Sequence, residues 1–426
     1  MGIKNFSQTF EHDKLIKIKE MKGLTIAIDA MTEIYRASLG AKYVNTLTDD
    51  EGKPTLYLSV ILLNIFEFYK SGVNQIWVFD YDQKHDESFH NPDKIDELLK
   101  RKKKKDEAME KIKKIREEVL FSDSEEENEE EKKTADINSL GKKTIDINSL
   151  EKQIFSVNHE IIEELKLMLN CLNIQWVESP RGFEGEAVAT YLNITGKANA
   201  VYSGDTDPIA MGAKVLFRKN TRDKQIYVYT QNSILKQIRD KNENIEDPSI
   251  KDIRKIAMIL GTDWCEKTPR IGAKTVIKKL HNIDLTKKQK EKMHNFEKLP
   301  NEEIQINNSD KIPFVNCNIE GLILWLVKNK KFNEDIWRPR FEKAINERER
   351  SLLNEREGPF KPQKHKKGKI NSQNIKTNVK KSNTDTVVKI KSNVENTTKI
   401  RSNTEKKITI DENNSDKIIM RKKPAP

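Results

Sequence analysis

The sequence predicts an α/β fold with a mainly parallel sheet flanked by helices. Three short apolar runs, 24–28, 75–79 and 198–202, have the length of buried strands, and another strand is expected at 174–177. Segments with helical apolar spacing at 56–69 and 161–172 lie between them. Strands that alternate with helices are typical of a parallel sheet with helices on its faces.

Acidic residues follow three of the predicted strands. Asp29 and Asp80 come directly after the first two runs, and Asp205 follows the third after Ser-Gly. In open α/β sheets the functional site lies outside the carboxyl ends of the strands. We therefore expect these three carboxylates to share one edge of the sheet.

Two closely spaced carboxylate pairs add to this set. Glu184 and Glu186 flank one residue, as do Asp205 and Asp207. In an extended segment the two side chains of such a pair face the same side. Hard cations take oxygen ligands, and two ions need several carboxylates. A single pair is usually a solvated turn, but two pairs beside strand-terminal aspartates indicate a metal site.

A helical hairpin is predicted further along the chain. A helix at 250–260 ends at a turn that contains Asp263, and a second helix is expected at 275–281. A glycine-containing turn at a helix start exposes backbone N–H groups that can hold a phosphate. The pattern predicts a helix-two-turn-helix element, with an ordinary hairpin as the alternative. The residues expected at the phosphate are Arg270, Ile271, Gly272 and Lys274.

A dense basic run at 100–105 lies inside a helical stretch from 94 to 119. Lys94 and Arg101 are seven residues apart, nearly two helical turns, so they share a face. Such a run is usually a solvated helix face. Its place between two strands that end in aspartates favours the alternative, a phosphate contact.

Two segments have the composition of unfolded chain. An acidic run at 122–131 precedes a tandem repeat. The tail from 361 carries 18 basic and 6 acidic residues, a net charge of +12. Residues 1–360 therefore have a net charge of −1. Local clusters, not bulk charge, must therefore bind nucleic acid. We expect four parts: an N-terminal region with a basic arch (1–120), a disordered insert (121–157), an internal region (158–350) and a disordered basic tail (351–426).

Three cysteines without paired spacing argue against a disulfide framework or a zinc site. No apolar run approaches the roughly 18 residues that span a bilayer, so no membrane partner is expected.

The order of these motifs resembles the flap endonuclease family of the XPG superfamily of structure-specific 5′ nucleases, which has a PIN-like fold. The resemblance rests on an initial Met-Gly-Ile and then IAIDA, WVFD, FEGEA, SGDTD, LGTDWC and IGAK, in that order. It implies a flap endonuclease and 5′–3′ exonuclease that hydrolyses branched DNA in replication and repair. The family carboxylates hold two Mg²⁺ ions, for which Mn²⁺ substitutes, and they correspond to Asp29, Asp80, Glu184, Glu186, Asp205, Asp207 and Asp263.

Other roles come from the same resemblance. Lys94 and Arg101 match catalytic arch residues that contact the scissile phosphate. Tyr35 matches an aromatic residue that stacks on a base near the cut, with a core tyrosine as the alternative. Gly2, after removal of Met1, would place its amine near the site.

The chain departs from the family at several points. The family hairpin has Gly-Ile-Gly and a DNA-anchoring potassium ion, whereas this chain has Arg270 in place of the first glycine. Two alternatives follow: a K⁺ site is kept here, or the charge of Arg270 replaces it. No tail motif for docking on a sliding clamp is present, so clamp recruitment is not expected. The basic ending at 420–424 suggests a nuclear location. A 5′ exonuclease, a junction-cutting paralogue and a non-catalytic nucleic-acid-binding scaffold are the alternatives, and retention of all the carboxylates argues against the last.

Overall fold

The computed structural model describes residues 2–40, 47–81, 95–122, 156–219 and 225–356, with single positions at 147, 150 and 154. The chain divides into two units, Met1–Phe360 and Lys361–Pro426, and all described residues belong to the first. Most of the predicted insert, and nearly all of the predicted tail, lies outside the described residues. No helix within these ranges has the length and apolarity needed to cross a bilayer.

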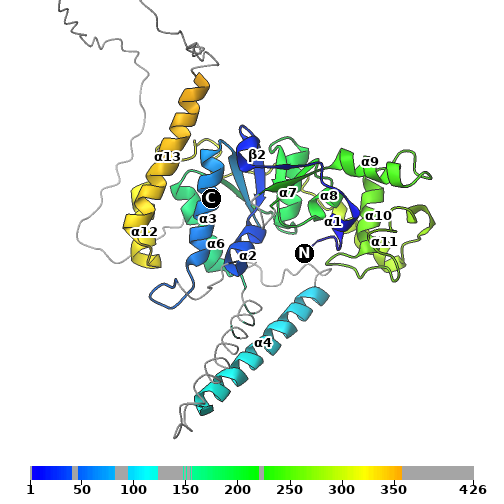
Figure 1. Cartoon of the computed structure of the whole chain (residues 1–426), viewed down its shortest axis with the longest axis horizontal. Helices are drawn as coiled ribbons and strands as arrows, with labels where there is room; N and C mark the ends of the chain where they lie inside the picture. The colour runs from blue at the N-terminus through cyan, green and yellow to red at the C-terminus, as the bar shows by residue number, and fades with distance from the viewer. Residues whose placement is uncertain are drawn as a thin grey trace, which may run out of the picture. The chain divides into compact units, whose positions relative to one another are not determined.

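Seven strands form one mixed sheet in the order β1-β7-β6-β5-β2-β3-β4. Figure 1 shows the sheet lying between helices. Five of them, β6, β5, β2, β3 and β4, run parallel, which confirms the predicted mainly parallel sheet. β7 pairs antiparallel with β6, because residues 220–225 between them are too few for a crossover helix, and β7 also pairs antiparallel with β1. The strands are β1 (Lys14–Ile16), β2 (Thr25–Asp29), β3 (Asn74–Phe79), β4 (Gln175–Glu178), β5 (Ala200–Tyr202), β6 (Val215–Lys219) and β7 (Ile226–Thr230).

The central strands send alternate side chains into two different hydrophobic clusters, one on each face of the sheet. In β2, Ala27 belongs to the first cluster, while Ile26 and Ile28 belong to the second. In β3, Val78 and Trp77 divide in the same way. Successive residues of a strand point to opposite faces, so a strand with two buried faces reads as an unbroken apolar run. That is why these strands were predictable.

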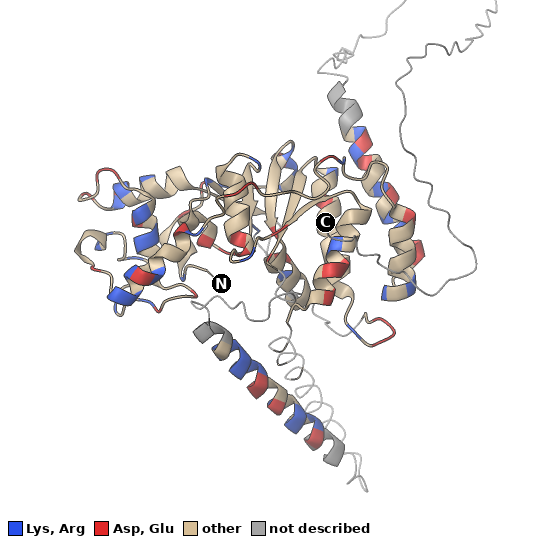
Figure 2. Cartoon of the chain, turned by 180° about the vertical axis from the view of Figure 1, so that it is seen from behind, with Lys and Arg blue, Asp and Glu red and all other residues tan. Residues whose placement is uncertain are grey.

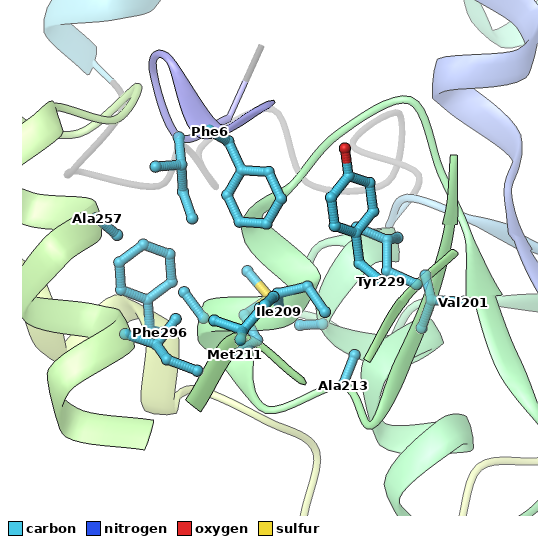
Figure 3. Packing of buried hydrophobic residues seen from close by; sticks show 14 of the residues in the cluster. Phe6, Val201, Ile209, Met211, Ala213, Tyr229, Ala257 and Phe296 are labelled. Atoms are coloured by element: carbon cyan, nitrogen blue, oxygen red, sulfur yellow. The ribbon is translucent and has the colours of Figure 1, made fainter. Parts of the chain in front are cut away.

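Helices cover both faces. Figure 3 shows the first cluster, in which Ile209 and Met211 lie among Phe6, Ala257 and Phe296. The elements on this side are α1 (Phe6–Thr9), α7 (Gly185–Ile194), α8 (Asp207–Met211), α9 (Gln231–Lys241), α10 (Ile250–Leu260), η4 (Leu280–Asn282), α11 (Lys287–Met293) and η5 (His294–Glu297). Those on the other side are η1 (Ile18–Met21), α2 (Ala30–Gly40), α3 (Leu56–Lys70), α6 (His159–Cys171), α12 (Ile319–Lys330) and α13 (Glu334–Arg356).

The first helix of the predicted hairpin is present as α10. The prediction of a second helix at 275–281 is wrong. Residues 273–279 form turns, and the short 3₁₀ helix η4 follows. The carbonyl of Ile277 accepts a 2.6 Å hydrogen bond from the Asn242 side chain, and the carbonyl of Leu280 accepts one from Lys255. An α-helix over 275–281 would bond the Ile277 carbonyl to the backbone N–H of His281, whereas the Asn242 side chain takes it here. The β-branched run from Thr275 to Ile277 further weakens helix formation.

The predicted basic helix is α4 (Ile95–Ser122), along which basic and acidic bands alternate in Figure 2. Ala108 and Ile112 are buried one turn apart, so the helix has an apolar side. Within the predicted insert, Ile147, Leu150 and Ile154 are helical and half-buried, at spacings that place them on one helix face. The arch itself stays a prediction.

Phe341→Ala tests how the C-terminal helices are held. The Phe341 ring in α13 is 1% exposed and packs edge-on against Phe66 of α3 at a centroid distance of 4.9 Å. Its truncation should cost about 3–5 kcal/mol in the free energy of unfolding, measured by urea denaturation. The control is Ile336→Ala in the same helix, where the side chain is 48% exposed. Equal losses for both variants would contradict tight packing of α13 on α3.

Candidate active site

Three aspartates gather at one edge of the sheet. Asp29 ends β2 and lies opposite Val78, two residues before Asp80. In the other direction Ile28 pairs with Tyr202, three residues before Asp205. Because β2 lies between β3 and β5, the carboxyl ends of these strands place all three acids side by side, where the sequence predicted them.

Asp29 is held by hydrogen bonds. Its carboxylate is 3% exposed and accepts a 3.1 Å bond from the Thr32 backbone N–H, a second bond from the Thr32 hydroxyl and a 2.8 Å bond from Ser203 Oγ. Ser203 Oγ also accepts a 2.9 Å bond from the backbone N–H of Asp205. One hydroxyl therefore joins the loop after β5 to the end of β2. Sequence reasoning missed Ser203, although it stands two residues before Asp205, a spacing that puts both on one side of an extended segment.

The start of α7 lies directly against the end of β3. The backbone N–H of Gly185 donates a 2.6 Å hydrogen bond to Asp80 Oδ1. A Cβ atom added at Gly185 would lie 3.0 Å from that oxygen and 3.4 Å from the Val78 carbonyl oxygen. Glu184 is the N-cap residue of α7, and Glu186 is in its first turn. Carboxylates are favoured at a helix N-terminus, where the helix dipole is positive.

Asp205 and Asp207 are both buried, and Asp207 begins the short helix α8. Thr206, between them, accepts a 3.0 Å hydrogen bond through Oγ1 from the backbone N–H of Ile3. A Cβ atom added at Gly2 would overlap Asp205 Oδ1, and the φ of +85° at Gly2 also favours glycine. The N-terminal segment therefore packs against the Asp205 loop.

The same segment contacts the loop after α10. The backbone N–H of Lys4 donates a 3.0 Å bond to the carbonyl of Gly261, two residues before Asp263. Asp263 in turn forms a 3.3 Å ion pair with Arg101 of α4. The Arg101 and Asp263 side chains are 46% and 20% exposed, so solvent screens this attraction. The geometry brings Arg101 to a predicted metal ligand; Lys94, its proposed partner, lies outside the described residues.

The predicted hairpin residues differ in environment. Arg270 is exposed with a φ of +62°, Lys274 is exposed, and Ile271 packs partly against the core. The backbone N–H of Gly272 donates to Thr275 Oγ1 at 3.3 Å, so it already has an acceptor within the turn. A Cβ atom at Gly272 would meet nothing within 4 Å, so space alone does not require glycine there.

A buried charge network beside Asp29 was not predicted from the sequence. Glu33 is 1% exposed and forms an ion pair with Arg36. Burial raises the pKa of the Glu33 carboxyl; the positive charges of Arg36 and Lys219 oppose this shift, and the charge of Asp29 adds to it. Tyr35, half-buried, lies between the paired residues in the same helix.

Within the described ranges, no three His, Cys, Asp or Glu side chains are arranged as a ready-made metal cluster. Nearby carboxylates repel one another without cations. Asp29, Asp80 and Asp263 also accept bonds from Ser203, Gly185 and Arg101. The predicted ligands are all carboxylates, and hard cations prefer such oxygen ligands. The residues therefore fit a hard cation.

Comparison with known proteins finds sequences similar to the part of the chain that carries this site. The model of the XPG I-region matches residues 173–263, which include all the predicted carboxylates except Asp29 and Asp80. Flap endonuclease 1 of Sulfolobus acidocaldarius is 29% identical over 362 residues, covering 78% of this chain and 92% of that protein. In sequence, the chain is similar to the flap endonucleases. The Picrophilus torridus flap endonuclease 1 is 27% identical over 293 residues, covering 66% of this chain and 77% of the relative.

Solved structures give the same fold. The flap endonuclease-1 of Methanococcus jannaschii has a TM-score of 0.55 at 20% identity, covering 82% of this chain and 100% of that one. Human GEN1, solved in complex with Holliday junction DNA, has a TM-score of 0.53 at 16% identity, covering 85% and 81%. The predicted resemblance to flap endonucleases and the predicted 5′-nuclease fold are thus confirmed.

Ser203→Ala tests the hydroxyl that connects Asp29 to the Asp205 loop. Loss of a group that orients metal ligands typically weakens metal affinity by about 10–100-fold. We expect a shift of that size in Mn²⁺ binding, measured by electron paramagnetic resonance of the free ion. Ser233→Ala in α9 is the matched control, because the Ser233 backbone, not its hydroxyl, bonds to Thr230. Unchanged affinity in Ser203→Ala would remove the assigned role.

Proposed function

We propose that this chain is a metal-dependent nuclease that cuts branched DNA at 5′ flaps and has 5′–3′ exonuclease activity. The observation that carries the proposal is the gathering of Asp29, Asp80 and Asp205 at the ends of three adjacent strands. The flap endonuclease relatives supply the reaction and the substrate class. The direct test is cleavage of labelled 5′ flap, nicked, blunt, four-way and single-stranded DNA in the presence of Mg²⁺, with the flap expected to be cut fastest.

Two Mg²⁺ ions are proposed at the carboxylates. Bound there, such ions lower the pKa of water and stabilise the leaving oxygen of a phosphodiester. Mn²⁺ is proposed as a substitute, since it takes the same oxygen ligands. The proposed ligands are Asp29, Asp80, Glu184, Glu186, Asp205, Asp207 and Asp263.

The protein's own task is to position these acids. Ser203 and Gly185 fix the carboxylates of Asp29 and Asp80 through hydrogen bonds of 2.8 Å and 2.6 Å. Burial of Asp205 and Asp207 restricts their side chains and limits access of water. A site held in this way does not have to reorganise as charge develops on the phosphate.

Arg101 is proposed to stabilise the scissile phosphate. Its guanidinium already contacts Asp263, one of the proposed ligands, and is proposed to exchange this carboxylate for a phosphate oxygen when DNA binds. A guanidinium donates paired hydrogen bonds to either anion. Lys94 is proposed as its partner, and Tyr35 as the residue that stacks on a base beside the cut.

Duplex DNA is proposed to bind through its phosphates at the hairpin. Arg270 and Lys274 are exposed there and supply positive charge without reading sequence. A K⁺ ion in this turn is a separate proposal, tested by comparing duplex affinity in potassium and lithium salts. Equal affinities in the two salts would leave the positive charge of Arg270 as the anchor.

Asp205→Asn is expected to abolish cutting and to leave 5′-flap binding nearly unchanged. The substitution keeps side-chain size but removes one charge from the carboxylate set, whereas binding depends on phosphate contacts elsewhere. Single-turnover cleavage across a Mg²⁺ titration measures the first effect, and fluorescence anisotropy the second. Asp240→Asn, at an exposed position in α9, is the control. Wild-type cleavage by Asp205→Asn would exclude the two-metal assignment.

Arg101→Ala is expected to slow single-turnover cleavage by about 10²–10³-fold, the usual loss when one donor to a developing anion is removed. Mg²⁺ affinity should be retained, because Arg101 is not a carboxylate ligand, and added Mg²⁺ should not restore the rate. Lys111→Ala, an exposed residue of the same helix, controls for general loss of positive charge. Equal rates for the two variants would disprove the role of Arg101.

A further inference from the structure

Two of the three cysteines lie together although they are far apart in the sequence. Cys171 ends α6, and Cys317 lies just before α12. The backbone N–H of Asn318 donates a 2.9 Å hydrogen bond to the carbonyl of Cys171, so the peptide group that follows Cys317 rests on the end of α6. Both side chains are half-buried and pack against the same hydrophobic cluster.

Two further hydrogen bonds fix this arrangement. Phe314 N–H donates to the Leu172 carbonyl at 2.9 Å, and the Asn173 side chain donates to the Val315 carbonyl at 2.8 Å. The Phe314 ring also stacks on Tyr69 at a centroid distance of 4.0 Å. The turn before α12 is therefore fastened to the end of α6 on both sides of the cysteines. Close, fixed backbones are what a disulfide requires.

The thiols also interact with each other. Burial raises the pKa of Cys171, and the nearby Cys317 raises it further. Burial also raises the pKa of Cys317, but backbone N–H groups of Cys317 and Ile319 at the start of α12 favour its thiolate. Of the two sulfurs, Cys317 is the one that backbone N–H groups stabilise as a thiolate, so it is assigned the first step.

We propose that Cys171 and Cys317 are a reversible oxidation site, which a peroxide converts to a disulfide joining α6 to α12. The Cys317 sulfur attacks one peroxide oxygen, the O–O bond breaks, and the released hydroxide takes the thiol proton to form water. The resulting sulfenic acid is attacked by the Cys171 sulfur, the S–S bond forms, and a second water leaves. The two thiols together lose two electrons, which the peroxide gains, and an external dithiol reverses the reaction.

The disulfide stabilises a turn that is unfavourable by itself. Phe314 and Asn316 have φ values of +62° and +49°, in the left-handed region that residues with side chains rarely adopt. A disulfide at this turn keeps α12 attached to the end of α6 when the surrounding structure unfolds. Oxidation should raise Tm by about 5 °C.

Cys265 provides an internal control. It is 9% exposed, packs in the other hydrophobic cluster, and has charged groups such as Lys288 and Glu266 around it instead of a second thiol. It should stay reduced under conditions that join the other two.

The test uses the full chain with equimolar hydrogen peroxide, followed by thiol counting after denaturation, intact mass and non-reducing peptide mapping. We expect loss of two thiols, a mass decrease of about 2 Da, a linked peptide pair containing Cys171 and Cys317, and recovery by dithiothreitol. Cys265→Ser should behave like wild type. Cys171→Ser should gain about 16 Da without a link, and should lack the rise in Tm.

Three results would overturn the proposal: a link that includes Cys265, oxygen addition to both cysteines of the wild type without a link, or retention of all thiols in excess peroxide. If Cys171→Ser folds poorly, as judged by circular dichroism of the reduced protein, Cys317→Ser replaces it. The mapping of wild type and Cys265→Ser decides the question without either variant.

Discussion

Mutual repulsion of carboxylates is the constraint on which this structure depends. The parallel strands β5, β2 and β3 bring Asp205, Asp29 and Asp80 to one edge, where their like charges oppose folding unless other groups offset them. Hydrogen bonds to Asp29 and Asp80, and an ion pair between Asp263 and Arg101, stabilise the negative charges. These contacts offset part of the repulsion at this edge of the sheet.

The parts predicted from sequence were those encoded by neighbouring residues. Strands β2 and β3 are unbroken apolar runs because both faces are buried, and α10 has apolar residues at helical spacing between Ser249 and Gly261. The strand-end positions of Asp29 and Asp80 follow at once, since parallel strands end at the same edge.

The parts that could not be predicted depend on residues distant in sequence. The expected helix after Gly272 gives way to turns where the distant Asn242 side chain takes the Ile277 carbonyl. Ser203 acquires its role only when β5 lies beside β2. The contact between Arg101 and Asp263 joins segments on opposite sides of the acidic insert, so no local pattern contained it.

The close approach at Gly185 has a consequence for reading mutational data. A single added methyl group would lie 3.0 Å from Asp80 Oδ1, so a replacement has to shift that carboxylate by a few tenths of an ångström. In a saturation scan this position should be as intolerant as its acidic neighbours, although it offers no side chain to metal or DNA. A position at this edge of the sheet can therefore be intolerant of substitution because its backbone packs closely or because its side chain takes part in the reaction. Scan data alone do not separate these two causes.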